Sequence, residues 1–280
     1  MAGRDAENLG HYAYARLYEK TFAQRKQDIE FYLRLAERCA PASILEYGAG
    51  AGRVTLPLIR QGHRVTAIDA SREMLALLDQ KAQRLPQHAR ERLSLLPGDM
   101  RKKRLRTRFP LVLATFNVVA HLPHFQDMAA FLRRVKEHLS HDGLLVFDVS
   151  IPHPEEVEAD PEALHPAARF KHPETSEWIR QTERFEYDPS SQTLLVESKL
   201  RSEQGGDELV IPLYLRQWFP REVDAILRYE GFTSIETYAD FSESPGVFAT
   251  DSLVFCASAR KPRGMRKSQS QVPAQSLPRV

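Results

Sequence analysis

Apolar and polar residues follow a regular alternation between residues 42 and 149. Short apolar runs of strand length are separated by segments whose apolar residues recur at helical spacing. Ser71 has the side chain of a helix N-cap, and residues 141–143 are predicted as the turn after a helix. Strands are predicted over 43–47, 64–69, 93–96, 111–115 and 144–149, and helices from 54, over 71–84 and over 127–139. This alternation predicts an α/β fold with a Rossmann-like, doubly wound sheet.

The pattern changes after residue 150. Prolines at positions 152, 154, 161, 166 and 173 predict a long irregular crossing. Three runs with alternating apolar residues follow at 177–187, 192–201 and 208–218, and we expect them to form a small antiparallel sheet. A helix over 220–229 that stops at Gly231, and strands over 233–238 and 252–259, complete the predicted elements.

These elements predict four parts of the chain. Residues 1–40 form a helical cap, in which Tyr14, Leu17 and Tyr18 share one face. Residues 41–150 and 219–260 form the core, and residues 151–218 form an antiparallel β insertion that binds the acceptor. Residues 261–280 form a basic tail, rich in Pro, Ser and Gln, that is expected to be disordered.

Composition narrows the class of protein. The 280 residues carry a formal net charge of +2, which does not by itself indicate a nucleic-acid or membrane partner. The two cysteines, Cys39 and Cys256, have no spacing typical of a zinc site or a disulfide framework. Residues 1–7 lack the apolar segment of a signal peptide, and no apolar run approaches the ~20 residues that a membrane helix needs. A soluble, cytoplasmic protein is expected.

The densest basic run lies at residues 101–108, in the link between the third and fourth predicted strands. A solvated loop is the favoured interpretation. In the alternative, this run and the basic residues at 260–267 guide an RNA or protein substrate.

The most informative segment is a glycine-rich turn between the first strand and the following helix. Gly48, Ala49 and Gly50 follow the strand directly. Glycine allows positive φ and a close backbone approach to a ligand, and the next helix directs its free N–H groups to the same place. The dinucleotide fingerprint of NAD enzymes would place a small residue at position 53, where Arg53 stands.

Glycines at 48, 50 and 52 behind the acidic Glu46 resemble motif I of the class I S-adenosylmethionine-dependent methyltransferases. Three later segments extend the resemblance in the same order: Asp69 at a strand end, Gly98-Asp99-Met100 after the third strand, and 111–117 as the fourth strand. The resemblance covers about residues 30–259. Within the class, residues 117–122 and the insertion resemble the glycine N-methyltransferase-like and amino-sugar N-methyltransferase group.

The resemblance implies a seven-stranded sheet whose last strand is antiparallel, with S-adenosylmethionine as cofactor and S-adenosylhomocysteine as product. Asp69 would accept the ribose hydroxyls, as in NAD enzymes, and Asp99 the adenine amine. Arg25 and Arg53 are candidates for bidentate binding of the cofactor carboxylate. The implied cofactor residues are Tyr18, Arg25, Glu46, Gly48, Ala49, Gly50, Arg53, Asp69, Ala70, Met74, Gly98, Asp99, Met100, Phe116 and Asn117.

Methyl transfer is an in-line displacement, so the protein mainly aligns the reactants and excludes water. An amine acceptor must lose its proton, which a base or a desolvated pocket can arrange. His121, just past the fourth strand, is the candidate base, with a structural or cofactor-positioning histidine as the alternative. Tyr14 is a second catalytic candidate, which with Tyr18 would close over the methionine part, although ordinary core packing also fits their spacing. No metal site is expected, since His121 and His124 lack a carboxylate partner.

The functional prediction is a methyltransferase for a small-molecule acceptor, with nitrogen favoured over oxygen as the methylated atom. The alternatives are an RNA or protein methyltransferase and a protein that binds the cofactor without catalysis. A homodimer is compatible with the sequence, which does not identify the acceptor.

Overall fold

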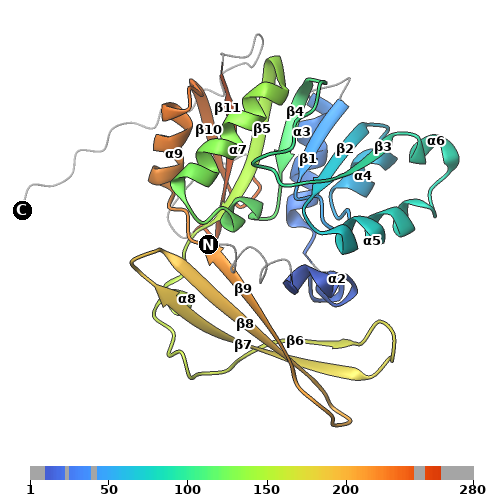
Figure 1. Cartoon of the computed structure of the whole chain (residues 1–280), viewed down its shortest axis with the longest axis vertical. Coiled ribbons are helices and arrows are strands. Elements are labelled where there is room, and N and C mark those ends of the chain that lie inside the picture. Colours follow the sequence, from blue (N-terminus) through green and yellow to red (C-terminus); the bar gives the residue numbers. More distant parts are fainter. Residues whose placement is uncertain (1–9, 23–24, 39–42, 243–249, 260–280) are drawn as a thin grey trace, which may run out of the picture.

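A seven-stranded sheet forms the centre of the molecule (Figure 1). The computed structural model describes residues 10–22, 25–38, 43–242 and 250–259. The strand order is β10-β11-β5-β4-β1-β2-β3. The bounds are β1 (Ser43–Tyr47), β2 (Arg64–Asp69), β3 (Leu93–Pro97), β4 (Phe109–Ala114), β5 (Leu139–Ser150), β10 (Ser234–Ala239) and β11 (Ser252–Ser258).

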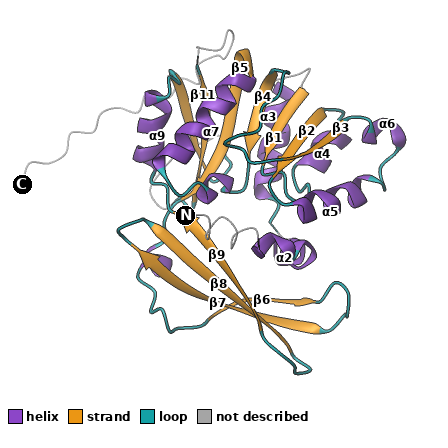
Figure 2. Cartoon of the chain, viewed as in Figure 1, coloured by secondary structure: helices purple, strands orange, loops and turns teal. Residues whose placement is uncertain are grey.

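Strands β1 to β5 pair in parallel, and β11 is antiparallel to both of its neighbours, β5 and β10. The predicted Rossmann-like sheet with an antiparallel last strand is therefore confirmed. Its central strands β1 and β4 are mostly apolar because helices cover both faces (Figure 2). Apolar residues of α7 (Phe125–His138) and α9 (Pro220–Tyr229) pack on one face, and those of α3 (Gln27–Arg38), α4 (Thr55–Arg60) and α5 (Arg72–Ala82) on the other.

A separate four-stranded antiparallel sheet lies below the carboxyl ends of the core strands in Figure 1. Its strands, in order, are β6 (His165–Lys171), β7 (Trp178–Asp188), β8 (Thr193–Ser202) and β9 (Leu209–Arg216). Helix α2 (Ala15–Phe22) packs between this sheet and α5, with Leu17 buried against Ile179, Leu200 and Ile211 of the sheet. The segment before the first core strand therefore bridges the two sheets.

The proline-rich crossing is more regular than its sequence predicts. It contains α8 (Pro154–Val157) and the edge strand β6, whose pairing with β7 shifts register between Pro166 and Ala168. Proline is tolerated there because an edge strand needs hydrogen bonds on one side only. The prediction of an irregular crossing was therefore wrong for residues 165–171.

The predicted turn at 141–143 was also wrong, because β5 begins at Leu139 and runs through these residues. A Cβ on Gly143 would lie 3.0 Å from the carbonyl oxygen of Phe109. Glycine is thus required by a close strand-to-strand approach, beside the register shift between β4 and β5, rather than by a helix end. The short helix α6 (Gln87–Arg90) was not predicted.

Other predicted boundaries agree with the structure. Ser71 caps α5, its hydroxyl accepting the N–H of Met74 at 3.2 Å, and Gly231 follows α9 with φ +86°. The predicted basic tail and Cys39 lie outside the described residues. In the described part of the chain, no helix is both long and apolar enough to cross a membrane.

Candidate active site

Two cavities adjoin at the carboxyl ends of the core strands. The first cavity has a volume of about 470 Å³ and lies over β1, β2, β3 and β4. The second cavity, of about 250 Å³, lies between α2, the turn after β4 and the small sheet. Both are lined by Tyr12, Tyr18, Phe116 and His121. These four side chains therefore stand where the contents of the two cavities would meet.

The structure gathers most of the predicted cofactor residues around the first cavity. Tyr18, Gly48, Gly50, Asp69, Ala70, Met74, Gly98, Asp99, Met100 and Phe116 line it. Arg25 and Asn117 line the second cavity instead, while Glu46, Ala49 and Arg53 line neither.

The two glycines of the turn serve different purposes. Both have positive φ, +65° at Gly48 and +53° at Gly50. A Cβ on Gly48 would lie 2.2 Å from Val118 in the short helix η1 (Val118–His121), so this glycine allows close packing. A Cβ on Gly50 would meet no atom within 4 Å. Because Gly50 lines the first cavity, its missing side chain leaves backbone open to a ligand.

Asp69 is held rigidly at the end of β2. One carboxylate oxygen accepts the N–H of Gly50 at 2.7 Å, and the other accepts the N–H of Ser71 at 2.8 Å. Burial raises the pKa of this carboxyl group, against the opposing effect of these backbone hydrogen bonds. Each carboxylate oxygen keeps a lone pair for a further donor, so Asp69 can accept hydroxyl groups from a ligand.

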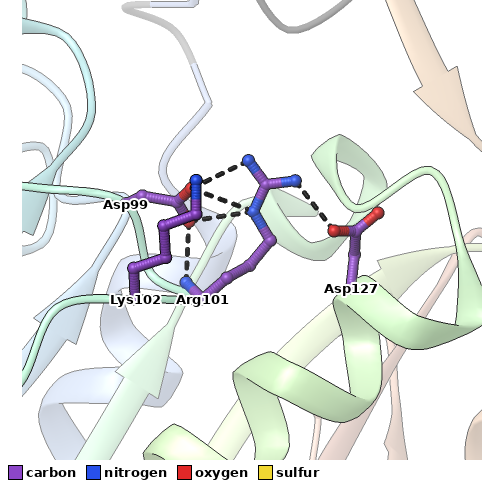
Figure 3. A network of polar contacts seen from close by, with 4 residues as sticks. All are labelled: Asp99, Arg101, Lys102 and Asp127. Atoms are coloured by element: carbon purple, nitrogen blue, oxygen red, sulfur yellow. Dashed lines mark hydrogen bonds and ion pairs between the residues drawn. The ribbon is translucent and has the colours of Figure 1, made fainter. Parts of the chain in front are cut away.

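Asp99 is the centre of an ionic network (Figure 3). The Arg101 guanidinium donates to both of its oxygens at 2.8–3.0 Å and also binds Asp127 at 2.8 Å. Lys102 lies 3.6 Å from the same carboxylate. Burial alone would raise the pKa of Asp99, but the hydrogen bonds from Arg101 outweigh it and lower the pKa. Asp99 is thus kept ionised at the wall of the first cavity.

The turn after β4 has an unusual backbone that a buried carboxylate holds in place. Phe116 and Asn117 have φ values of 65° and 54°, a region that non-glycine residues rarely adopt. Their N–H groups donate to the two oxygens of Asp148 at 2.7 Å each, and the Tyr32 hydroxyl donates to the same carboxylate at 2.6 Å. Asn117 in turn accepts the N–H of Ser150 at 3.2 Å. Sequence reasoning missed Asp148, whose signal is an acidic residue inside an otherwise apolar strand.

Arg25 and Arg53 both stack on Phe116, with guanidinium carbons 4.9 and 4.5 Å from the ring centre. Arg53 also makes a bidentate ion pair with the buried Asp28, at 2.6 and 2.5 Å. Its guanidinium is thereby committed to the packing behind Phe116. Arg25 remains the candidate for a ligand carboxylate.

Tyr12 and His121 form a dyad between the cavities. The Tyr12 hydroxyl lies 2.7 Å from Nε2 of His121, and the rings meet edge to face. Burial raises the pKa of the Tyr12 phenol well above its ordinary value, so we assign the hydroxyl as donor and Nε2 as acceptor. Tyr14 is 42% exposed and lines the second cavity. The sequence analysis named Tyr14, whereas the side chain that contacts His121 is that of Tyr12, two positions earlier.

Some side chains of the basic run at 101–108 make hydrogen bonds and ion pairs within the fold. Besides the Arg101 ion pairs, Lys103 donates to the Pro97 carbonyl at 3.0 Å and Arg108 to the Leu139 carbonyl at 2.9 Å. Lys102, Arg104 and Arg106 are exposed. Part of the charge in the run therefore stabilises the walls of the site.

The known proteins that this chain resembles are methyltransferases. A family model described as a methyltransferase domain matches residues 45–145. A glycine/sarcosine N-methyltransferase from Aphanothece halophytica is 27% identical over 128 residues, which are 45% of this chain. The match covers about half of that relative, 47% of its length.

Solved structures agree with this match. The CcbJ methyltransferase from Streptomyces caelestis has a TM-score of 0.74 and 25% identity, over 85% of this chain and 92% of its own. The family model, the Aphanothece halophytica relative and this solved structure together support a class I S-adenosylmethionine-dependent methyltransferase. The glycopeptide N-methyltransferase MtfA, solved with S-adenosylmethionine, shares the fold at a TM-score of 0.56 and 22% identity, over 86% and 91% of the two chains.

The walls of the first cavity in this methyltransferase fit S-adenosylmethionine. Gly50 leaves its backbone open to the cavity, and Asp69 offers fixed acceptors for two ribose hydroxyls. Met100 and Leu122 supply apolar wall, and Asp99 an acceptor for an exocyclic amine. A donor and acceptor set of this kind matches the ribose and the base of a nucleoside.

Glu46 acts behind the turn rather than in the cavity wall of the methyltransferase. Its side chain is 1% exposed and accepts the Thr55 hydroxyl at 2.5 Å, which ties the end of β1 to the start of α4. Ala49 is similarly structural, since its N–H donates to the Ile68 carbonyl at 3.2 Å. Both residues shape the backbone that Gly50 presents.

The buried Glu46 predicts a pH dependence of stability. Burial raises its pKa from 4.5 to about 7. The folded state therefore holds this proton more tightly, and its contribution to stability is lost as the pH rises through this window. Relative to wild type, Glu46→Gln should gain up to about 3 kcal/mol in free energy of unfolding between pH 5 and pH 8. Urea unfolding at both pH values measures the change.

The exposed Glu91→Gln, directly after α6, serves as the control and should show no such gain. A stability difference between Glu46→Gln and wild type that stays constant with pH would contradict the assignment.

Proposed function

We propose that this protein transfers a methyl group from S-adenosylmethionine to an amine nitrogen of a small-molecule acceptor. The observation that carries the proposal is the meeting of the two cavities at Tyr12, Tyr18, Phe116 and His121. The first cavity would hold the cofactor and the second the acceptor. Nitrogen is favoured because the relatives named above include a glycine/sarcosine and a glycopeptide N-methyltransferase.

When bound, S-adenosylmethionine supplies a methyl carbon that is electrophilic because it is attached to a positively charged sulfur. The residues of the chain would align the reactants and exclude water from them. Asp69 and Gly50 would fix the nucleoside end, while Tyr18 and Phe116 would surround the junction through which the nucleophile approaches. Phe116 is held there by the Asp148 network and by the two stacked arginines. Alignment and exclusion of water are the main requirements of an in-line displacement.

The Tyr12–His121 dyad would remove the proton that an ammonium group must lose before it can attack. The Tyr12 oxygen accepts this proton while its own hydroxyl proton passes to Nε2 of His121. The amine is left with a free lone pair and His121 with a positive charge. The predicted catalytic role of His121 is thus retained, with Tyr12 as the group that contacts the acceptor.

A binding experiment tests the cofactor part of the proposal. S-adenosylhomocysteine should raise the melting temperature of the protein, while NAD should leave it unchanged, because a ligand of the native state alone stabilises that state. Isothermal calorimetry then gives the stoichiometry, expected to be one per chain. A shift with NAD alone, or with neither ligand, would contradict the cofactor assignment.

A further inference from the structure

The second cavity contains a polar strip on an otherwise apolar wall. Gln181 of β7 and Ser198 of β8 are only 4% and 5% exposed, although both line the cavity. Glu183 continues the strip along β7. The surrounding wall is formed by apolar side chains, among them Phe22, Phe185, Val196, Leu200 and Ile211. Buried polar groups weaken a sheet face unless they are hydrogen-bonded, so a strip of this kind needs a reason.

The hydrogen bonds of the strip converge on one oxygen of Glu183. Gln181 Nε2 donates to Glu183 Oε1 at 2.9 Å, and Ser198 Oγ donates to the same atom at 3.3 Å. The Thr21 hydroxyl of α2 donates to Oε1 of Gln181 at 3.2 Å. Across the described ranges, no donor is recorded on the second oxygen, Oε2. The network therefore fixes the direction of a carboxylate that still has an oxygen to offer.

A second carboxylate lies close to the first. Glu156 of α8 lines the same cavity and interacts electrostatically with Glu183. Burial raises the pKa of both groups. For Glu156, His153 lowers the pKa and the charge of Glu183 raises it. Within the described chain, neither carboxylate has an ion-pair partner.

The third acidic group of this wall is already engaged, since Asp148 accepts from Tyr32, Phe116 and Asn117. The cationic Arg25 stacks on Phe116. Glu156 and Glu183 are thus the two acidic groups of the cavity that no cation of the described chain pairs with directly, and His153 acts on Glu156 only electrostatically.

We propose that Glu183, assisted by Glu156, binds the protonated amino group of an acceptor whose apolar body packs against the small sheet. This assignment deepens the proposed methyl transfer and rests on it for the identity of the ligand as acceptor. An ammonium group would relieve the repulsion between the two carboxylates and occupy Oε2. A hydrogen bond to a charged group is worth about 1.5–3 kcal/mol, or about 10- to 100-fold in affinity.

The test compares two probes of similar shape, n-hexylamine hydrochloride and 1-hexanol. Both are titrated by calorimetry into the full chain saturated with S-adenosylhomocysteine. Hexylammonium should bind at least about tenfold more tightly than hexanol to wild type. Glu183→Gln keeps the size of the side chain and an acceptor for Ser198, and it should abolish this preference. Glu156→Gln should reduce it.

Glu186→Gln is the matched control, because Glu186 lies on the same strand but is exposed and does not line the cavity. It should keep the preference for hexylammonium. Unchanged affinity for S-adenosylhomocysteine in all three variants shows that they are folded.

The outcomes separate the two proposals. Absence of hexylammonium binding, equal binding of both probes, or a preference that survives in Glu183→Gln would overturn the role of Glu183 even if S-adenosylhomocysteine binds normally. If S-adenosylhomocysteine fails to bind while the hexylammonium preference follows Glu183, the cation site stands and the proposed methyl transfer fails.

Discussion

Asp148→Ala is expected to lower the free energy of unfolding by about 3–5 kcal/mol, the usual cost of breaking a buried charged network. The substitution leaves the N–H groups of Phe116 and Asn117 and the Tyr32 hydroxyl without their common acceptor. It also releases the only side chain seen to hold both N–H groups of this positive-φ turn among the described residues. Urea denaturation of the full chain at pH 7 measures the loss.

The same substitution should weaken methyl transfer by about 100-fold, because misplacing a reacting group by about 1 Å has effects of that size. Phe116 lines both cavities and would lose its fixed position. Asp148→Asn keeps one acceptor oxygen and should fall between alanine and wild type in stability.

Asp142→Ala provides the control on the same strand, since Asp142 is exposed in β5. Its effect should stay within about 0.5 kcal/mol. If Asp148→Ala were as stable as this control, the turn would be held by something other than the carboxylate.

Asp69→Ala is expected to reduce the affinity for S-adenosylhomocysteine by about 100-fold or more. Two hydroxyl hydrogen bonds to a carboxylate would be lost, each worth about 1.5–3 kcal/mol. In addition, the N–H groups of Gly50 and Ser71 would lose their acceptors, which loosens the backbone on that side of the cavity. Calorimetric titration of both proteins gives the ratio of dissociation constants.

Asp79→Ala is a suitable comparison, since Asp79 lies on the following helix and is exposed. It should bind S-adenosylhomocysteine like wild type. Equal affinity in Asp69→Ala would place the ribose elsewhere in the cavity and remove the main reason for assigning Asp69.

Some helix boundaries could be predicted from the sequence because single residues at the helix ends define them. The α9 boundaries match the prediction because Pro220 is favoured at the start of a helix, and Gly231, at φ +86°, adopts the backbone conformation that ends one. Ser71 was recognisable as a cap for the same kind of reason. These signals depend on a residue and its immediate neighbours, so no tertiary contact is needed to interpret them.

Strand β6 and the first part of β5 could not be predicted because they depend on pairing with a neighbouring strand, which the local sequence does not show. Strand β6 follows prolines and is held by β7 alone, and β5 extends through Gly143 because Phe109 of β4 lies beside it. A strand of this kind is defined by its neighbour rather than by its own propensity. Local patterns therefore indicated a crossing and a turn where the structure has strands.

The sequence by itself determined the order of the core strands, the glycine turn and the acidic residues at the strand ends, because each is encoded within a few consecutive residues. Only the tertiary structure decided which of the two nearby tyrosines reaches His121, that Arg53 pairs with Asp28, and that Asp148 holds the turn at Phe116. It also brought Glu156 and Glu183 to one cavity. These contacts join residues more than 20 positions apart, and long-range packing alone selects them.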